Sequence, residues 1–352
     1  IILPRSILYL EECSVKRQYI FLKEFAEAFG PSAAEDEISE IIQEALGKKF
    51  NIETTPHGNL IAWKKGKKRK KGQRVIMLQA HMDELGFRPF RYLPDGFIQV
   101  SPLSPLPDTV ANHPIRFFPG DKEGLLIVTK EQGQKRYYLD VGARNAQEAE
   151  REIPYHAVGA YNSVFGFSES EFTCKSFDDR AGCALIADLL HDTLNVNDPL
   201  VVGVITTREE TGSWPIPELV RKLNDLDLLP DLMINLEVCP GGPTPRNPKP
   251  IAVVGKGVGL VHMDKFYAAP SAVCRFMVDT AKRSKVPFQH VAMRDGGGEL
   301  GTLAFELGVK SYGFIIPGRY MHSPHSVISR FDFDATHDML HAVIENFGKL
   351  KL

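Results

Sequence analysis

Four apolar segments of this 352-residue sequence each end close to residues that can bind a metal ion. VIMLQA precedes His81, VVGVITTR precedes Glu209 and Glu210, LMINL precedes Glu237, and SYGFIIP is followed after a short turn by His322. Short, nearly continuous apolar runs of this kind are typical of buried strands in α/β sheets. In open α/β sheets, ligands bind just beyond the carboxyl ends of the strands. The sequence therefore predicts that these five side chains converge on one site.

The segments around these runs alternate between helical and strand-like spacing. Helical apolar spacing covers residues 15–29, 34–46, 179–194, 217–226, 271–284 and 332–347. Strand-like runs cover residues 59–63, 75–80, 200–206, 232–236 and 311–316. We therefore predict an α/β fold in which a mixed sheet is flanked by helices.

Residues 87–166 differ from the rest of the chain in composition and in hydrophobic pattern. Prolines and glycines are frequent, and short β-like runs occur at 97–100, 115–118, 125–129 and 137–141, with one short helical stretch at 146–151. This pattern predicts a small β-rich domain. We expect it to be inserted into the larger domain, which then comprises residues 1–86 and 167–352.

The number and spacing of the cysteines limit the kind of metal site that is possible. Five cysteines are scattered along the chain without a CxxC pair: Cys13, Cys174, Cys183, Cys239 and Cys274. An odd, scattered set argues against a disulfide framework and against a thiolate zinc site. We expect buried thiols, a cytoplasmic location and metal ligands drawn from histidines and carboxylates.

Charge and hydropathy exclude two classes of partner. The formal net charge of -2 argues against a general nucleic-acid-binding protein. No apolar run reaches the roughly 18–20 residues that a membrane span needs, and residues 1–10 do not resemble a signal peptide.

The segment 63–74, WKKGKKRKKGQR, contains eight lysines or arginines. We interpret it as a solvated hairpin loop rather than a polyanion-binding loop.

Two further residues extend the candidate site. His81 and Asp83 form an H-x-D pair, in which the carboxylate would accept the second ring N–H of a metal-bound histidine. Asp178 opens a predicted helix in FDDRAG. It would either cap that helix or bridge two cations.

The adjacent Glu209 and Glu210 would divide two roles. On an extended chain, neighbouring side chains point to opposite sides, so one carboxylate would bind metal while the other reaches a water molecule. Two metal ions lower the pKa of a shared water and polarise a carbonyl. A carboxylate outside the ligand set must then carry the proton, and Glu209 fits this role of general base.

Taken singly, each residue has an explanation that needs no metal. The alternatives are a surface histidine at 81, a helix N-cap at 178, a solvated strand end at 209–210, a salt bridge at 237 and a loop histidine at 322. Their combination favours the metal site.

Two glycine-rich segments, 255–259 and 295–301, lack a complete phosphate-loop pattern. We interpret both as turns, and we expect Gly297, Gly298 and Glu299 in the second to line a substrate cleft.

Five motifs occur in an order that resembles one family. AHMDELGF, FDDRAG, REETG, DGGGELG and RYMHSP together resemble the glutamyl-aminopeptidase and tetrahedral-aminopeptidase family of cocatalytic metallopeptidases. The resemblance implies a zinc-exopeptidase-like domain interrupted by a β-barrel-like dimerisation domain, two zinc or cobalt ions per chain, short peptide substrates, and dimers or dodecamers. It assigns the metal ligands and the general base Glu209 residue by residue, with Asp178 as the bridging ligand and His322, rather than His325, as the last histidine. The ligands are His81, Asp178, Glu210, Glu237 and His322.

Three departures from the family pattern leave alternatives open. Glu237 stands where the family usually has Asp, GGGELG replaces a GGTDAG-like loop, and SWPIPELV follows REETG. A glutamate in place of that Asp tends to accompany carboxypeptidases among related enzymes. The alternatives to an aminopeptidase are therefore a metal-dependent carboxypeptidase, a small-molecule deacylase, or a non-catalytic scaffold member of the family.

Overall fold

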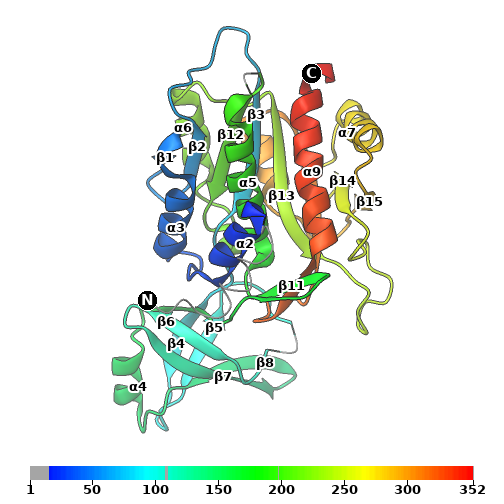
Figure 1. Ribbon diagram of the computed structural model, residues 1–352. Coiled ribbons are helices and arrows are strands. Elements are labelled where there is room, and N and C mark those ends of the chain that lie inside the picture. Colours follow the sequence, from blue (N-terminus) through cyan, green and yellow to red (C-terminus); the bar gives the residue numbers. More distant parts are fainter. Residues whose placement is uncertain (1–15, 108–109, 197, 352) are drawn as a thin grey trace.

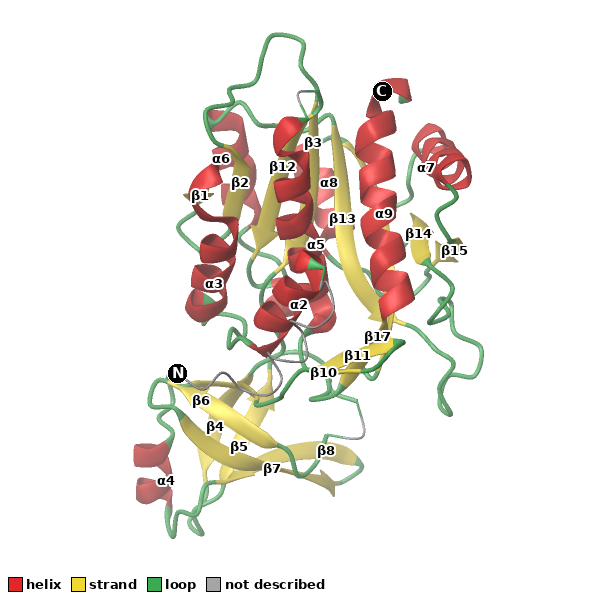
Figure 2. Cartoon of the chain, viewed as in Figure 1, coloured by secondary structure: helices red, strands yellow, loops and turns green. Residues whose placement is uncertain are grey.

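The computed structural model describes residues 16–107, 110–196 and 198–351. A large mixed sheet carries helices on both faces, and a closed barrel lies below it in the view of Figures 1 and 2. This architecture confirms the predicted α/β fold with an inserted β-rich segment.

The large sheet is built from eleven strands of the described chain. In chain order they are β1 (Phe50–Thr54), β2 (Leu60–Lys64), β3 (Val75–His81), β10 (Gly166–Phe167), β11 (Glu171–Cys174), β12 (Leu200–Thr206), β13 (Leu232–Pro240), β14 (Val258–Met263), β15 (Phe288–Ala292), β16 (Lys310–Arg319) and β17 (Ser326–Ser329). Their spatial order is β1-β2-β12-β3-β13-β16-β17-β11-β10, with β14 and β15 attached beside β16. The central strands β12, β3, β13 and β16 run parallel. Their carboxyl ends therefore meet at one edge.

Helices cover the two faces of this sheet unequally. They are α2 (Arg17–Glu27), α3 (Asp36–Leu46), α5 (Phe177–Asp192), α6 (Ile216–Asp225), α7 (Ser271–Ser284), α8 (Glu299–Leu307) and α9 (Arg330–Asn346). Strand β3 shows how both faces are made apolar. Its Ile76 and Leu78 belong to the core cluster that includes residues of α2, α3, α5, α7 and α9, whereas its Val75 and Met77 belong to the cluster that includes residues of α6 and α8. Successive side chains of a strand point to opposite faces, so a nearly continuous apolar run suits a strand covered on both sides.

The inserted barrel closes on itself in the order β4-β5-β8-β7-β6-β9. Its strands are β4 (Phe87–Tyr92), β5 (Ile98–Pro102), β6 (Pro114–Phe118), β7 (Lys122–Glu131), β8 (Gln134–Asp140) and β9 (Val158–Tyr161), with helix α4 (Ala146–Glu152) between β8 and β9. A separate apolar core fills it, including Phe87, Ile98, Phe117, Leu126 and Leu139. The barrel is thus a second packing unit, inserted into the chain between β3 and β10 of the large sheet.

Some elements differ from the sequence-based expectation. The basic segment 63–74 is not a hairpin loop, because β2 and β3 are separated by β12 in the sheet. Part of it is anchored, since Arg69 contacts Asp231 and Lys67 Nζ donates to the Val196 carbonyl. Strands β14 and β15 were not expected. Helix α8 begins at Glu299, where a turn was predicted.

Two sequence-level expectations fall partly outside the described residues. Cys174, Cys183, Cys239 and Cys274 are unpaired, whereas Cys13 lies outside them. Residues 1–10 also lie outside, so their interpretation is untested by the structure. Among the helices that the structure describes, none combines the length and apolar character needed to cross a bilayer.

Candidate active site

The predicted metal ligands meet at the carboxyl edge of the parallel strands. His81 is the last residue of β3 and pairs in register with Thr206, the last residue of β12. Glu237 lies near the end of β13, and His322 follows β16. These strand ends open into a cavity of about 660 Å³ that is lined by residues including Asp178, Glu209, Glu210, Glu237 and His322.

One group of possible ligands surrounds His81. Its Nε2 lies 3.0 Å from Asp178 Oδ1 and 3.6 Å from Glu237 Oε1. A second group surrounds His322, whose Nε2 lies 3.3 Å from Asp178 Oδ2 and 3.2 Å from Glu210 Oε1. In each group the ligand atoms lie within 4.8 Å of one another. Asp178 belongs to both groups and turns one carboxylate oxygen toward each.

The electrostatics of this cluster fit divalent cations. Although burial opposes it, contacts with the His322 and His81 rings hold the pKa of Asp178 well below its ordinary value. Burial and the neighbouring Asp178 raise the pKa of Glu237, and no described residue hydrogen-bonds its buried Oε2. A buried carboxylate with a free oxygen beside other carboxylates is costly without a compensating charge. Histidine nitrogens and carboxylate oxygens are suitable ligands for zinc and similar metals.

A local arrangement at the start of α5 leaves Asp178 available to the histidines. Asp178 and Asp179 have non-helical backbone angles, and the peptide bond between them is cis. Asp179, rather than Asp178, accepts the backbone N–H of Gly182 through Oδ1 at 3.1 Å. Asp179 thus performs the capping role that was considered for Asp178. A side chain at Gly182 would clash, since its Cβ would lie 2.3 Å from Asp179 Oδ2.

The extended-chain explanation for Glu209 and Glu210 is wrong. Both lie in a 3-10 turn, Glu209–Thr211, that follows a left-handed Arg208 with φ of 65°. Their side chains nevertheless separate, because Glu210 reaches His322 whereas Glu209 Oε2 lies 3.9 Å from His81 Nε2. Glu209 belongs to neither ligand group. Burial and the nearby carboxylates, opposed by His81, raise the pKa of Glu209 to about 8.

Asp83 is fully buried and holds two parts of the site in place through hydrogen bonds. Its carboxylate accepts the backbone N–H groups of Glu209 at 3.0 Å and Glu210 at 3.2 Å, and also the Ser32 hydroxyl. The closest partner of His81 Nδ1 is the Asp83 backbone carbonyl at 3.0 Å, while Asp83 Oδ1 is 3.4 Å away. One aspartate therefore fixes both the histidine ring and the glutamate turn.

Comparison with known proteins identifies the chain. The M42 glutamyl aminopeptidase family matches residues 58–339. The chain belongs to this family. It is 27% identical over 308 residues to the lysyl aminopeptidase of Pyrococcus furiosus, covering 82% of this chain and 85% of the relative. This M42 peptidase is therefore a hydrolase of a metallopeptidase family.

Two solved structures share the fold. A TET aminopeptidase from a marine sediment Thaumarchaeota archaeon superimposes with a TM-score of 0.84 at 22% identity, covering 95% of this chain and 99% of the other. The TET1 peptidase of Pyrococcus horikoshii, described as able to assemble into a tetrahedron or a large octahedral shell, gives a TM-score of 0.77 at 18% identity, covering 93% and 99%. The mixed sheet with an inserted barrel is therefore a shared architecture.

Residues 297–299, in the glycine-rich segment of the M42 peptidase, lie partly at the cavity and partly in the protein interior. Gly297 and Gly298 line the cavity. Glu299 does not, because its side chain turns inward as the first residue of α8. Its Oε2 accepts hydrogen bonds from Gln79 Nε2 and Thr206 Oγ1. Burial raises the pKa of Glu299 to about 7. Glu299 is therefore buried and is not among the described residues that line the cavity, contrary to the expectation that it would.

Gly298 gives a testable link between backbone and ligand geometry. A Cβ at this position would lie 2.4 Å from Glu237 Oε2. We expect Gly298→Ala to displace the Glu237 carboxylate and to reduce kcat/KM by about 10²-fold, the cost typical of misplacing catalytic groups by an ångström. Steady-state kinetics and metal analysis would measure this. Gly297→Ala is the matched control, because its Cβ would face Asp264 and Phe266 instead, and an equal loss in both variants would contradict the explanation.

The cavity wall includes segments that the sequence did not single out. Residues 104–107, in the segment between β5 and β6, line it together with Met293 and Met321. The Pro105 carbonyl lies 2.8 Å from His322 Nδ1. His325 lies apart from both ligand groups and packs its ring against His113. The barrel therefore contributes directly to the position of a predicted ligand.

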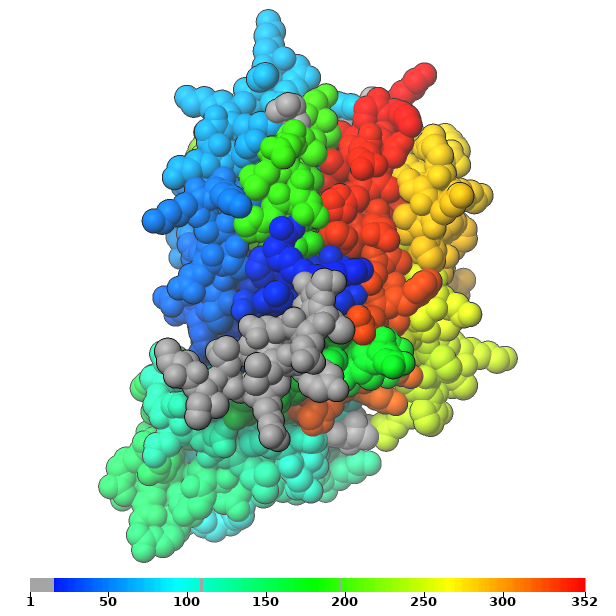
Figure 3. Space-filling model, viewed as in Figure 1, coloured from blue at the N-terminus to red at the C-terminus, as the bar shows by residue number. Residues whose placement is uncertain are grey.

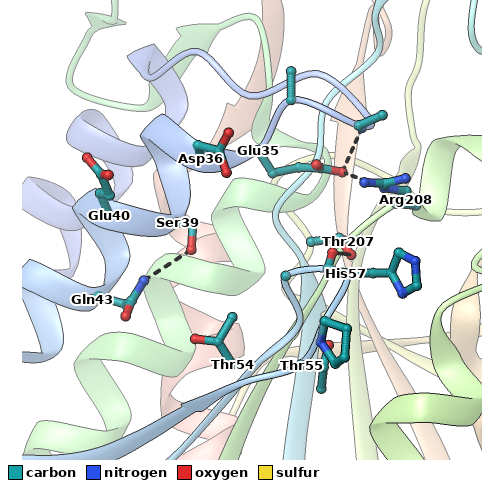
Figure 4. Close-up of a pocket in the computed structure, with 14 residues that line it drawn as sticks. Glu35, Asp36, Ser39, Glu40, Gln43, Thr54, Thr55, His57, Thr207 and Arg208 are labelled. Carbon is teal, nitrogen blue, oxygen red and sulfur yellow. Dashed lines mark hydrogen bonds and ion pairs between the residues drawn. The ribbon is translucent and has the colours of Figure 1, made fainter.

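A second cavity, of about 470 Å³, has a mainly polar lining (Figure 4). Its lining comes from the start of α3, the β1–β2 turn and residues 207–208. Glu35 Oε1 lies 3.6 Å from Arg208 Nε, and burial together with Asp83 raises the pKa of Glu35 to about 7. Among the described residues that line this cavity, none belongs to the two groups around Asp178. The first cavity is therefore the better candidate for catalysis.

Proposed function

We propose that this M42 peptidase removes N-terminal residues from short peptides with two divalent metal ions, zinc or cobalt. The observation that carries the proposal is the shared Asp178, whose two oxygens face two separate ligand groups. His81 and Glu237 complete one group, and Glu210 and His322 complete the other. A pair of such ions, when bound, polarises the scissile carbonyl and activates water.

Glu209 is the residue we assign to proton transfer. It lines the cavity but lies outside both ligand groups, so its carboxylate remains available to the reacting water. As general base it would accept a proton from the attacking water and return it to the leaving amine nitrogen. Asp83 would hold Glu209 and Glu210 in this arrangement through their backbone N–H groups.

The charge of the cavity favours the amino end of a peptide. Its carboxylates are Asp178, Glu209, Glu210, Glu237 and Asp295, and none of the described lining residues is lysine or arginine. A carboxypeptidase would need a cationic group near the substrate carboxylate. With Asp178, Glu210 and Glu237 holding two divalent ions, the carboxylates of Glu209 and Asp295 remain, and these would attract a terminal ammonium. This observation favours an aminopeptidase over a carboxypeptidase despite the unusual Glu237.

We also infer that the chain works as a homo-oligomer, either a dimer or a dodecamer, in the cytoplasm. The ability of the Pyrococcus horikoshii TET1 peptidase to form large shells supports the first inference. The unpaired thiols at Cys174 and Cys183 support a reducing compartment.

A panel of amino-acid anilides tests the substrate assignment. We expect hydrolysis of anilides with a free amino group and at least about 100-fold slower hydrolysis of their N-acetylated forms, because blocking removes the recognised ammonium. Removing metal with a chelator should abolish activity, and zinc or cobalt should restore it. Hydrolysis of only the blocked substrates would instead identify a deacylase, and release of C-terminal residues from free peptides would identify a carboxypeptidase.

A further inference from the structure

Helices α2, α5 and α9 lie on the same face of the sheet (Figure 3), and two aspartates on α5 face two histidines on α9. Asp188 and Asp192 are four residues apart on one helix, and His337 and His341 are four residues apart on the other. Residues at this spacing lie on the same side of a helix. Because the two helices pack together, the four side chains form one cluster.

The distances within this cluster bring the polar atoms close together. His341 Nε2 lies 3.1 Å from Asp192 Oδ2, and His337 Nε2 lies 3.8 Å from the same oxygen. His337 Nε2 also lies 2.9 Å from Asp188 Oδ2. The ligand atoms of Asp192, His337 and His341 all lie within 4.8 Å of one another.

Arg17 on α2 orients both aspartates. Its Nε lies 2.5 Å from Asp188 Oδ1, and its Nη2 lies 2.5 Å from Asp192 Oδ1. Each carboxylate therefore gives one oxygen to the guanidinium and turns its other oxygen toward the histidines. Outer partners that fix the orientation of ligand groups in this way are common around metal sites.

We propose that Asp192, His337 and His341 bind a third divalent transition-metal ion, such as zinc, nickel or copper, at this surface. Ligand atoms about 2.0–2.1 Å from a tetrahedral zinc ion are separated from one another by about 3.3 Å, close to the 3.1 and 3.8 Å measured here. Asp188 lies outside this group of three and, of its members, contacts only the His337 ring. Two imidazoles select a transition metal over calcium or magnesium, which prefer oxygen ligands.

The ion would join the C-terminal end of α5 to α9. Asp192 is exposed, and His341 is about one-third exposed, so the site is open to metal from solvent. It is separate from the ligand groups at the carboxyl edge of the sheet, and it does not depend on their function. The opposite end of α5 carries Asp178, so a bound ion would restrain the helix that positions the shared ligand.

Metal counting on the metal-depleted and reloaded full chain tests this site. With zinc as the probe, we expect His337→Ala/His341→Ala to bind one ion fewer per chain than the wild type, whatever number the catalytic groups hold. With copper as the probe, electron paramagnetic resonance should show imidazole nitrogen coupling that is reduced in His341→Asn. Peptidase activity at saturating metal should stay within about twofold of the wild type, since no catalytic group is altered.

His156→Ala is the matched control, because this exposed histidine belongs to none of the three groups. It should bind as many ions as the wild type. Equal zinc stoichiometry in the wild type and the double variant would overturn the proposal and leave the cluster as an ion-pair network. The single His341→Asn variant keeps the test decisive if the double variant fails to fold. If the wild-type chain binds the third ion but shows no peptidase activity, that result would count against the proposed function alone.

Discussion

Glu209→Gln is expected to lower kcat for peptide hydrolysis by about 10³-fold, within the range typical of a lost general base. Glutamine has nearly the same shape as glutamate but cannot accept the proton from water. Because Glu209 lies outside both ligand groups, the variant should bind as much metal as the wild type. Steady-state kinetics combined with metal analysis would show activity lost at full metal occupancy.

Asp295→Asn is the matched control for this experiment. Asp295 also lines the cavity and is exposed, yet it belongs to neither ligand group. We expect its effect on kcat to be at least tenfold smaller than that of Glu209→Gln, since an exposed carboxylate contributes mainly through screened charge. Retention of most activity in Glu209→Gln would reject the assignment of the base, while leaving the metal ligands untested.

Asp178→Ala should have the second large effect, the loss of both catalytic ions. Each oxygen of Asp178 faces a different histidine, His81 or His322. Removing the shared carboxylate therefore takes one ligand from each group. We expect no detectable hydrolysis and a stoichiometry two ions below that of the wild type after zinc loading and mild dialysis.

The variants His81→Ala and Glu210→Gln provide the comparison for Asp178→Ala. Each removes a ligand from only one group, so each should weaken one ion and leave the other. If all three variants lose the same number of ions, the two groups do not act as separate sites that share Asp178. A single ion in the wild type at catalytic saturation would have the same implication.

The pattern of apolar runs that end next to possible metal ligands predicted the site, because parallel strands bring their carboxyl ends together at one edge of the sheet. The hydrogen-bond register aligns the ends of β3 and β12, so residues that follow apolar runs meet at one edge whatever the loops do. His81 and Glu237 could therefore be placed from sequence alone. The strand pattern alone could not assign the shared role to Asp178, because that role depends on which aspartate caps α5 and DDR offers two adjacent candidates; only the resemblance to the family pointed to Asp178.

The parts that sequence reasoning missed depend on backbone conformation or on distant contacts. Glu299 follows three glycines, and nothing local shows that its side chain turns inward to Gln79 and Thr206. The turn at Glu209 starts from a left-handed Arg208, a conformation that sequence predicts well only for glycine or asparagine. The basic segment was assigned to a hairpin because chain neighbours are usually sheet neighbours, whereas here β12 comes between them.

The hydrogen bond between the Pro105 carbonyl and His322 makes the position of the barrel part of the metal chemistry. His322 is held from one side by the inserted domain and faces Asp178 and Glu210 on the other. A rotation of the barrel against the sheet would change the affinity of one metal position. By reciprocity, an ion at that position would resist the rotation to the same extent. If subunits associate through the barrel, assembly and metal occupancy become a single linked equilibrium, and neither can be measured without fixing the other.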